Sequence, residues 1–461
     1  MDSLTALSVL DGRYAAMTTD LTDIFSEAGL IRNRVTVELQ WLKFLGRDLR
    51  LFDLSAEDAE KIDAIGRAFD VNRARAVKDI EKTTNHDVKA VEYYIKGELE
   101  TAGLGAVKEW THFACTSEDI NNSAYALMIR QGRTVVAGAL AALLKVVEDM
   151  ATAHKAVPMM ARTHGQPATP TTVGKEFVNF AWRLSRELEK FLAAEIQAKL
   201  NGASGNFNAH LAAFPDIDWI AASRRFIADY LGAAPLLFTT QINPYHYISE
   251  LLQIMIRFSG ALIDLDRDMW GYISLGYFTQ KLKPGEVGSS TMPHKVNPID
   301  FENSEGNLGV AISLMSHLSV KLLHSRFQRD LTDSTVLRNM GAVFGYVLIG
   351  IKNCLKGMGK LAVNRAAIQA DLDNNPALLA EPIQTVMRMC GEADPYEKLK
   401  ALTRGKTISS ADLCRLVDSL EKVPADCRQR LRALTCDAYT GVAEQLVDAY
   451  FSARQGKDDG R

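Results

Sequence analysis

The sequence predicts an all-α fold in which a bundle of long helices occupies the middle of the chain. Three observations predict this class. Apolar residues recur three and four positions apart over several segments of about twenty residues or more. Prolines and glycines stand at the ends of these segments, where helices start and stop. The sustained apolar alternation that a β-sheet needs is not found in the chain.

The first part of the chain, residues 1–110, is predicted to form a domain of shorter helices. Ser55 and Asp58 stand three residues apart, ahead of an apolar repeat, with the spacing of a capping box. A serine in this place accepts a hydrogen bond from a backbone N–H that the helix itself leaves unpaired. We therefore expect a helix to begin just after Ser55.

The middle part, residues 111–363, holds the longest repeats. One of them follows Pro170 and forms a continuous apolar stripe at Val173, Phe177, Ala181, Leu184, Leu188 and Leu192. An unbroken helix from there to Gly202 would be about 45 Å long, at a rise of about 1.5 Å per residue. Comparable segments are Ser117–Ala153, Tyr247–Leu275, Asn303–His324 and Met340–Leu361. Helices of this length bury their stripes by lying side by side, so we expect a bundle.

After about residue 364 the repeats become short again. Helix breakers recur there at Pro376, Gly391, Pro395, Gly405 and Pro424. The chain is long enough for two or three domains with a large buried core. We expect three helical domains, namely an N-terminal domain (1–110), a central long-helix bundle (111–363) and a C-terminal domain (364–461).

Composition and charge are those of an ordinary soluble globular protein. Hydrophobic residues make up 47% of the chain and charged residues 24%. A formal net charge of -3 argues against a nucleic-acid surface and against a polybasic membrane patch. The opening residues MDSLTALSVLDGRY lack the basic segment and apolar core of a secretory signal. The apolar runs are shorter than a membrane span, and we expect a cytoplasmic protein.

Several kinds of site are disfavoured by the absence of their motifs. The six cysteines form no CxxC pair and are too sparse for a disulfide scaffold. HExxH, zinc-ligand spacing and an Asp-rich calcium loop are absent, so a metal site is not expected. The P-loop, a strand-associated GxGxxG and GxSxG are absent as well. We therefore expect no nucleotide hydrolysis, no dinucleotide cofactor and no serine acyl transfer.

Four polar clusters fall at predicted loops or helix starts. They are TTNHD (Thr83–Asp87), TSED (Thr116–Asp119), RTHGQPATPTT (Arg162–Thr172) and QRDLTDSTVLRN (Gln328–Asn339). TSED has the spacing of a plain helix cap, although the free amides of a helix start also bind anions. The third cluster predicts an irregular loop around His164, and a single loop histidine is more often incidental than catalytic. The fourth is either a charged helix end or an anion clamp formed by Arg329 and Arg338.

A further segment, GEVGSSTMPHKVNP (Gly285–Pro298), lies between two helical regions. By itself its composition is that of a solvated connector. Glycines at 285 and 288 allow a loop to fold tightly, and backbone amides in such a loop can stabilise an anion.

Within that segment, GSSTMPHKVN resembles the GSSxMPxKxN signature of the fumarase/aspartase superfamily, with seven matching positions in one run. The four polar clusters, in this order, are similar to those of the adenylosuccinate lyase family in particular. GRY near the start of the chain and TTQI (Thr239–Ile242) add to this resemblance. It covers nearly the whole chain, from about Leu4 to Leu446.

The resemblance implies a reaction and an assembly. The reaction is the elimination of fumarate from adenylosuccinate to give AMP, and from succinyl-aminoimidazole carboxamide ribotide (SAICAR) to give AICAR, in purine nucleotide biosynthesis. The assembly is a homotetramer whose long helices form its core, with sites shared between subunits. The resemblance implies small-molecule substrates and no cofactor. Net charge and the missing motifs, as given above, argue against a nucleic-acid partner, a membrane partner and a metal.

The same resemblance assigns catalytic roles. Ser289 would be the base that removes the proton from carbon, and it would ionise as its loop closes. His164 would be the general acid for the leaving nitrogen, with Glu302 setting its tautomer and basicity. His86 would bind substrate and assist proton transfer, and the division of roles between the two histidines stays open.

A larger set of residues would bind substrate. Arg13 and Tyr14 would meet the phosphate or ribose, and Lys295 would place a positive charge near Ser289. The complete set implied by the resemblance is Arg13, Tyr14, Asn85, His86, Asp87, Lys89, Thr116, Ser117, Gln241, Ser290, Lys295, Val296, Asn297, Asn303, Arg329, Ser334, Thr335, Val336, Leu337 and Arg338.

Two alternatives remain at this point. Another fumarate-releasing lyase, such as argininosuccinate lyase or aspartase, would share the signature loop, but TTNHD and QRDLTDSTVLRN favour a purine substrate. A non-catalytic structural protein would keep the same fold. The presence of Ser289, His164 and Lys295 argues against it.

Overall fold

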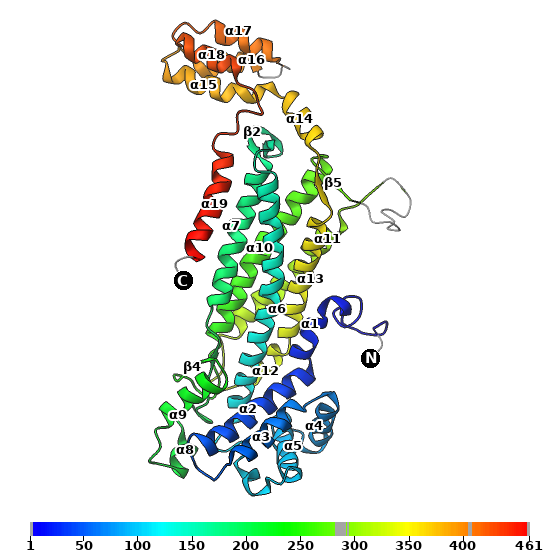
Figure 1. The fold of residues 1–461 in the computed structure, drawn as a ribbon, viewed down its shortest axis with the longest axis vertical. Coiled ribbons are helices and arrows are strands. Elements are labelled where there is room, and N and C mark those ends of the chain that lie inside the picture. The colour runs from blue at the N-terminus through cyan, green and yellow to red at the C-terminus, as the bar shows by residue number, and fades with distance from the viewer. Residues whose placement is uncertain (1–2, 282–291, 293–294, 404–407, 459–461) are drawn as a thin grey trace. The chain divides into compact units, whose positions relative to one another are not determined.

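The computed structural model describes residues 3–281, 292, 295–403 and 408–458 of the chain. Helices dominate these residues, and the strands are few and short (Figure 1). The predicted all-α class is therefore confirmed. The chain divides into two compact units. Unit 1 consists of Met1–Ala141, Glu187–Gly260 and Ser304–Lys352, and unit 2 consists of Ala142–Arg186, Ala261–Asn303 and Asn353–Arg461.

Among the described residues, five long helices contribute residues to both units. They are α6 (Ser117–Ala153), α7 (Val173–Ala193), α10 (His246–Ser274), α11 (Ile299–Lys321) and α13 (Met340–Met358). Each coincides with one long apolar repeat of the sequence. The ends of α6 and α10 lie within one residue of their predicted positions. The domain boundaries at residues 110 and 363 stay a prediction.

Helix α7 ends well before Gly202, contrary to the prediction, because side chains of α6 bind the backbone that follows it. The N–H of Lys199 donates to Asn122 Oδ1 at 2.8 Å. The N–H groups of Asn201 and Gly202 donate to the two carboxylate oxygens of Asp119 at 3.0 and 3.2 Å. These bonds satisfy amides that a longer helix would have used, so the chain leaves the helical path.

Besides its parts of the five long helices, unit 1 contains α2 (Glu27–Arg47), which has 21 residues, and a set of shorter elements. Val35, Leu39 and Leu42 of α2 are buried in an apolar cluster that includes Ile62 and Val91 from two other helices. Their spacing of three and four residues places them on one helix face. The shorter elements of unit 1 are α1 (Ala15–Phe25), α3 (Ala56–Arg67), α4 (Val71–Thr84), α5 (Asp87–Thr101), α8 (Asn208–Ala213), α9 (Trp219–Arg225), α12 (Thr332–Leu337), the 3₁₀ helix η1 (Gly105–Trp110), the π-helical turn η2 (Phe226–Tyr230), and the parallel strands β3 (Gln197–Ala198) and β4 (Ala234–Pro235).

The predicted cap at the start of α3 is present. Ser55 Oγ accepts a hydrogen bond from the N–H of Asp58 at 3.0 Å. The same hydroxyl donates to the Asp58 carboxylate at 2.7 Å. Helix α3 begins at Ala56, directly after its cap, as the sequence predicts.

Unit 2 contains a β-hairpin where the sequence predicts an irregular loop. β1 (Pro158–Thr163) pairs antiparallel with β2 (Gln166–Thr172), and His164 and Gly165 form the connection. Their φ angles, 55° and 73°, are the positive values that a tight two-residue hairpin turn requires. The loop prediction is wrong. It took the two prolines of this segment as evidence against a strand, but a two-stranded ribbon tolerates prolines that a larger sheet would exclude. His164 therefore occupies the tip of a defined hairpin.

Among the described residues of unit 2, the other elements are helices and one more antiparallel pair of strands. This pair joins β5 (Phe278–Gln280) to β6 (Leu361–Val363). The helices after residue 364 are short, as the breakers predict, and Figure 1 shows four of them gathered in one cluster, α15 to α18. These elements are α14 (Arg365–Asp373), the 3₁₀ helix η3 (Pro376–Leu379), α15 (Ala380–Met389), α16 (Pro395–Thr403), α17 (Ser410–Asp418), α18 (Ala425–Ala433) and α19 (Ala443–Asp458).

One segment of the described residues, Thr332–Met358, is long and apolar enough to cross a membrane by length and composition alone. This departs from the expectation that every apolar run is too short. However, 56% of the tested window is buried inside the protein. Val343, Phe344 and Val347 of α13 are fully buried. Burial in the protein core therefore accounts for the apolar character of α13.

Candidate active site

The TSED cluster forms the start of α6, and both of its carboxylates are buried. Asp119 Oδ2 accepts from the N–H of Thr116 at 2.9 Å, which is one of the two bonds of the predicted cap. Asp119 Oδ1 lies 2.8 Å from Nζ of Lys199, and both side chains are fully buried. Removing either partner of such a pair would leave an uncompensated buried charge. Asp119 therefore has a structural role at this helix start.

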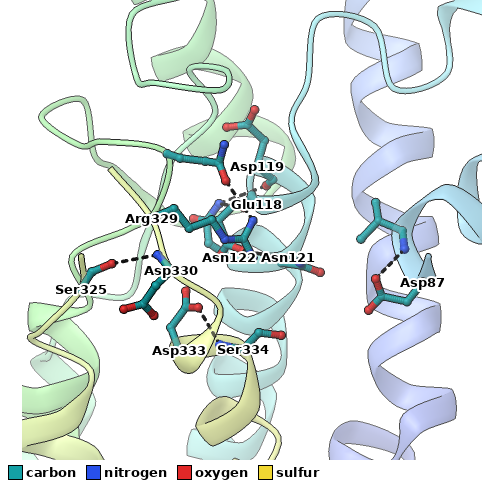
Figure 2. A network of polar contacts seen from close by, with 12 residues as sticks. Asp87, Glu118, Asp119, Asn121, Asn122, Ser325, Arg329, Asp330, Asp333 and Ser334 are labelled. Atoms are coloured by element: carbon teal, nitrogen blue, oxygen red, sulfur yellow. Dashed lines mark hydrogen bonds and ion pairs between the residues drawn. The ribbon is translucent and has the colours of Figure 1, made fainter. Parts of the chain in front are cut away.

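Glu118, the neighbouring carboxylate, is the centre of a polar network in unit 1 (Figure 2). Its side chain is only 2% exposed, and it accepts a hydrogen bond from the Tyr245 hydroxyl at 2.6 Å. Its other oxygen lies 3.3 Å from Nη2 of Arg329 and 3.4 Å from Nδ2 of Asn121. Figure 2 shows Arg329 extending toward Glu118 from the segment before α12. These donors replace the water that the carboxylate loses on burial.

Opposing effects place the pKa of Glu118 near neutral pH. Burial, aided by the nearby Asp333 carboxylate, raises the pKa of Glu118 to about 7. The hydrogen bond from Tyr245 and the charge of Arg329 oppose this rise. Burial also raises the pKa of Asp333, whose Oδ2 lies 3.4 Å from the Tyr245 hydroxyl. The network thus contains a group that changes charge close to pH 7.

Two of the predicted substrate-binding residues, Arg329 and Gln241, contact each other. Arg329 Nη1 donates to Gln241 Oε1 at 3.0 Å, and Gln241 Nε2 donates to the carbonyl of Ala203 at 3.0 Å. The predicted Ser334 lies on α12, where its N–H donates to Asp333 at 2.7 Å (Figure 2). Unit 1 therefore brings these predicted residues into one network.

The other predicted residues of α12 have different surroundings. Thr335 is exposed, Val336 is half-buried and Leu337 is buried. Leu337 and Arg338 line a small cavity of about 120 Å³ in unit 1. Only part of the predicted run from Ser334 to Arg338 is therefore exposed.

The TTNHD cluster connects α4 to α5. Asn85 ends α4 with a positive φ of 50°. His86 begins α5, and its Nδ1 accepts a hydrogen bond from the N–H of Lys89 at 3.2 Å. The His86 side chain is 52% exposed, whereas Nζ of Lys89 is paired with Glu92 at 2.8 Å. His86 therefore combines a capping role with an accessible ring.

Asp87, the last residue of that cluster, is held by two arginines. Its Oδ2 lies 2.7 Å from Nη2 of Arg34 and 3.3 Å from Nη2 of Arg338. Partial burial pushes the pKa of Asp87 upward, but the charge of Arg34, aided by a backbone N–H and Arg338, outweighs it and holds the pKa below its usual range. Arg338 also pairs with Glu27 at 2.8 Å. Both arginines of the predicted clamp, Arg329 and Arg338, therefore have carboxylate partners.

The remaining predicted residues of unit 1 lie at two helix starts. Arg13 is exposed, and its guanidinium lies 6.0 Å from the ring centroid of Tyr14. Tyr14 directly precedes α1. Thr116 and Ser117 are half-buried at the start of α6. Positive charge and helix amides are both suited to an anionic ligand.

His164 and Glu302, the predicted acid and its partner, both belong to unit 2. His164 is exposed at the hairpin tip. Glu302 is exposed as well, and it accepts a hydrogen bond from the indole N–H of Trp270 at 3.2 Å. Within the residues that the structure describes, no hydrogen bond or ion pair joins His164 to Glu302. Their pairing stays a prediction.

The signature segment is described only in part. Ser289 and Ser290 lie outside the described residues. The N–H of Lys295 donates to the carbonyl of Met292 at 3.0 Å. The other predicted residues of this region flank the start of α11, and they are Val296, Asn297 and Asn303.

The groups available in the described ranges suit an anionic ligand better than a metal ion. No three His, Cys, Asp or Glu side chains in those ranges are grouped as a metal site requires. By contrast, unit 1 holds the guanidinium groups of Arg13, Arg329 and Arg338, all of which are predicted to bind substrate. Guanidinium groups match the geometry of carboxylates and phosphates.

Two families of known proteins match this chain. Residues 12–312 match the family described as Lyase, and residues 325–440 match the family described as Adenylosuccinate lyase C-terminal. The adenylosuccinate lyase of Vibrio cholerae serotype O1 is 50% identical over 453 residues, which are 97% of this chain and 99% of that protein. The chain belongs to the adenylosuccinate lyase family.

Other members of the adenylosuccinate lyase family have a comparable identity to this chain. The protein of Escherichia coli (strain K12) is 50% identical over 97% of this chain and 99% of its own length. That of Legionella pneumophila (strain Corby) is 48% identical over 98% of this chain and 99% of its own length. These relatives match the chain from end to end.

Two solved structures share the fold of this adenylosuccinate lyase family member. The 3-carboxy-cis,cis-muconate lactonizing enzyme from Pseudomonas putida has a TM-score of 0.75 at 19% identity, covering 94% of this chain and 96% of that one. The fumarate lyase from Mesorhizobium sp. BNC1 has a TM-score of 0.77 at 18% identity, covering 94% and 97%. At these identities the likeness concerns the fold alone.

Sequence reasoning missed several members of the polar network. Arg34, Asn121 and Tyr245 belong to none of the predicted site residues, and Glu118 was included only as part of a helix cap. One signal was available, because Arg34 stands beside Val35 within an apolar repeat of α2. A charged residue is rarely buried unless it is paired, so this placement indicates a buried partner.

Proposed function

We propose that the protein is an adenylosuccinate lyase, which eliminates fumarate from adenylosuccinate to give AMP and from SAICAR to give AICAR. One observation carries this conclusion, namely about 50% identity to named adenylosuccinate lyases over 97% of the chain. A match limited to the signature loop would leave other fumarate-releasing lyases equally favoured. Here the match extends through residues 325–440, to the family described as Adenylosuccinate lyase C-terminal.

The proposed reaction is an elimination in which no oxidant or reductant takes part. A base removes a proton from the carbon beside a carboxylate. The C–H electron pair becomes part of the fumarate double bond, and the C–N pair leaves with the nitrogen. An acid protonates that nitrogen, which completes AMP or AICAR. The intermediate carries extra negative charge, so fixed N–H donors and cations around it lower the barrier.

Ser289 is the proposed base and His164 the proposed acid. A neutral hydroxyl is a weak base, so Ser289 must ionise as its loop closes over the substrate, with Lys295 supplying a nearby positive charge. An imidazole is suited to donate a proton near neutral pH. The exposed place of His164 at a hairpin tip supports its access to a substrate.

Glu302 and His86 complete the proposed catalytic set. Glu302 would accept a hydrogen bond from His164 and so fix the tautomer of the acid. Its exposed carboxylate supports this role, because exposure leaves it able to meet a partner from another chain. His86 would bind the substrate with its half-exposed ring at the start of α5.

The proposed nucleotide-binding groups are those of unit 1. Arg329, Gln241 and Ser334 would contact the nucleotide from one network, and Asp87 with Arg338 from another. Both arginines already have carboxylate partners. A bound phosphate would therefore either accept hydrogen bonds from these arginines alongside the carboxylates or displace the carboxylates. The succinyl carboxylates would be held by hydroxyls and amides at the start of α6 and in the signature segment.

We propose a homotetramer with shared sites. Large apolar side chains on three long helices support association, since Trp182 is 58% exposed, Trp270 49% and Val310 45%. Exposed tryptophans of this kind are typical of surfaces that another protein covers. His164 and Glu302 are both exposed, and within the described residues no hydrogen bond or ion pair joins them. This supports sharing, because a second subunit would supply each with its proposed partner.

A cytoplasmic location and the absence of a cofactor are part of the same proposal. The six cysteines form no disulfide, which agrees with a reducing compartment. The elimination needs only proton transfers, which side chains supply. Phosphorylated purine intermediates, the proposed substrates, are small soluble molecules.

Substrate choice is the direct test of the proposed function. The purified protein is incubated separately with adenylosuccinate, SAICAR, argininosuccinate and aspartate, and the fumarate released is measured. We expect fumarate from the first two substrates only. Release from argininosuccinate or aspartate without release from adenylosuccinate would reject the proposal in favour of another lyase. Absence of release from all four would favour a non-catalytic protein.

A further inference from the structure

Two pairs of proposed nucleotide-binding residues lie within unit 1. The first pair is Asp87 with Arg338, whose charged groups are 3.3 Å apart. The second pair is Arg329 with Gln241, joined by a hydrogen bond of 3.0 Å. The first pair combines the start of α5 with the end of α12, and the second combines two loop segments. To bind one ligand, these separate segments must be held at fixed positions relative to one another.

Three residues outside the predicted set connect the first pair to the second. Arg34 Nη2 lies 2.7 Å from Asp87, and Arg34 Nε donates to Asn121 Oδ1 at 2.9 Å. Asn121 Nδ2 donates to Glu118 Oε2 at 3.4 Å, and that oxygen lies 3.3 Å from Arg329. We call Arg34, Asn121 and Glu118 the relay. Figure 2 shows Asn121 and Glu118 on α6 with Arg329 on one side and Asp87 on the other.

The relay is buried from end to end. The exposed fractions of Arg34, Asn121 and Glu118 are 2%, 7% and 2%. Burying two charged groups is costly, and well-packed apolar residues of similar volume would often serve stability as well. A chain of hydrogen bonds in a dry environment is strong and directional, however, so it fixes the positions of the groups at its ends.

We propose that the relay positions the two pairs for binding one purine nucleotide, so that Arg34, Asn121 and Glu118 are positioning residues of the reaction proposed above. This inference rests on the proposed function. It assigns these three residues no contact with the substrate. Their effect passes through Asp87 at one end and Arg329 at the other.

The charge of Glu118 gives the relay a pH dependence. The groups that face it are the Tyr245 hydroxyl, the Arg329 guanidinium, the Asp333 carboxylate, the buried ammonium of Lys199 and the amide of Asn121. With Glu118 ionised, Arg329 is held by a charge-assisted bond. As the pH falls through about 7, Glu118 takes up a proton and that hold weakens. We therefore expect nucleotide binding to weaken on the acid side.

Kinetics of Glu118→Gln and Asn121→Ala test the relay with adenylosuccinate as substrate. Glu118→Gln removes the negative charge that holds Arg329 and nearly keeps the side-chain volume. Asn121→Ala removes both hydrogen bonds of the Asn121 side chain and reduces the volume modestly. We expect KM to rise about tenfold or more in each variant, with kcat changing less than about threefold, because binding geometry is lost and the reacting groups are untouched. The double variant is expected to lose less than the sum of the two, as residues of one network do.

The pH profile of KM separates a positioning role from a merely structural one. The ratio of KM in Glu118→Gln to KM in the unaltered protein is expected to be largest above about pH 7 and to approach one on the acid side. Ionisation of the substrate phosphate cancels in this ratio. Asn121→Asp keeps the acceptor for Arg34 but places a second negative charge beside Glu118. It should move the acid-side rise in KM to higher pH.

Asp63→Asn is the matched control. It removes a partly buried ion pair of 2.7 Å with Lys43, which stands on α2 as Arg34 does but lies outside the relay. We expect a lower melting temperature and an unchanged KM. The relay is overturned if Glu118→Gln and Asn121→Ala stay folded with KM within about twofold of the unaltered protein, or if Asn121→Asp leaves the pH profile in place. An unaltered protein that releases no fumarate would contradict the proposed function instead.

Discussion

His164 is held in an uncommon backbone conformation. Its φ of 55° lies in the left-handed region, which most residues avoid at a cost of about 1–3 kcal/mol. Histidine is among the residues that enter this region more readily. Because the following glycine is left-handed too, the two residues form a tight turn that leaves the imidazole exposed. The hairpin β1–β2 thus exposes the imidazole that we propose as the proton donor.

Replacing either proposed catalytic residue tests this assignment. We expect Ser289→Ala and His164→Ala each to lower kcat by about a hundredfold or more, because general acid and base groups contribute about 100- to 10,000-fold. Circular dichroism and melting temperature should stay near those of the unaltered protein. Ser419→Ala, at an exposed serine after α17, is the control and should keep full activity. Near-normal turnover of either variant would remove that residue from the mechanism.

His112 provides a second test, in stability. Its Nδ1 lies 2.6 Å from Glu38, a fully buried carboxylate. Burial lowers the pKa of His112, but the charge and hydrogen bond of Glu38 outweigh burial, so the pKa is raised. The folded state then binds this proton more tightly than the unfolded state does. The resulting stabilisation is complete below the unfolded pKa of about 6.5 and is lost as the pH rises through the raised value.

The measurement for His112 is urea unfolding of the unaltered protein and of His112→Gln across the pH range. We expect the unaltered protein to have the larger free energy of unfolding at acid pH, and the difference to shrink as the pH increases. A difference that grows with pH would contradict the assignment of a charged His112–Glu38 pair.

At the residue scale the sequence revealed the groups that stand in motifs and missed those that do not. Asp87, Arg329 and Arg338 were named from their clusters. Arg34 and Tyr245 have no motif, and their partners Asn121 and Glu118 lie 87 and 127 positions away in the sequence. A contact over such a distance follows from the packing of helices, which local patterns do not encode.

The secondary-structure elements show the same contrast. The start of α3 follows from the Ser55 cap and the ends of α6 follow from its own repeat, which are local features. The end of α7 does not, because Asn122 and Asp119 of another helix bind the backbone beyond it. The hairpin was missed because prolines in β2 conceal a strand pattern. The ends of an element could thus be predicted where its own residues determine them, and could not be predicted where residues distant in the sequence do.

Gly174 of α7 lies close to the backbone at the end of α6. A Cβ at this position would lie 2.4 Å from the carbonyl oxygen of Ala151 and 2.5 Å from Cα of Lys155. Both are backbone atoms, which yield less readily than the end of a side chain. We expect Gly174→Ala to lower the free energy of unfolding by about 1–3 kcal/mol, measured by urea denaturation.

The control for Gly174 is Gly97→Ala. Gly97 is exposed within α5, and a Cβ there would meet nothing within 4 Å. Alanine favours helix over glycine, so this variant should gain about 0.5–1 kcal/mol. If both variants shift stability in the same direction, close approach is not the reason for the glycine at 174.

The assembly of the whole molecule can be tested by mixing inactive variants. If Ser289 and His164 of one site come from different subunits, Ser289→Ala and His164→Ala subunits together form some intact sites. We expect part of the activity to return after the two proteins are mixed and allowed to exchange subunits. The unmixed variants are the controls. Absence of recovery after exchange has been verified by mass would count against shared sites.

The fold class of the whole molecule was accessible from the sequence because long apolar repeats and their breakers extend over most of the chain. The arrangement within a site was less accessible. His164 and Glu302 illustrate this, since one chain leaves both exposed and their proposed contact depends on a second copy. Sequence patterns describe one chain, whereas a shared site is a property of several.

Unit 1 is assembled from three separate stretches of the chain, and the last of them ends at Lys352. The ribosome synthesises these stretches one after another. Asp119 leaves the exit tunnel long before Lys199 and Asn201, the groups that neutralise or bind it. Unit 1 therefore cannot close until synthesis has passed Lys352, and its apolar helices stay open to misassociation in the meantime.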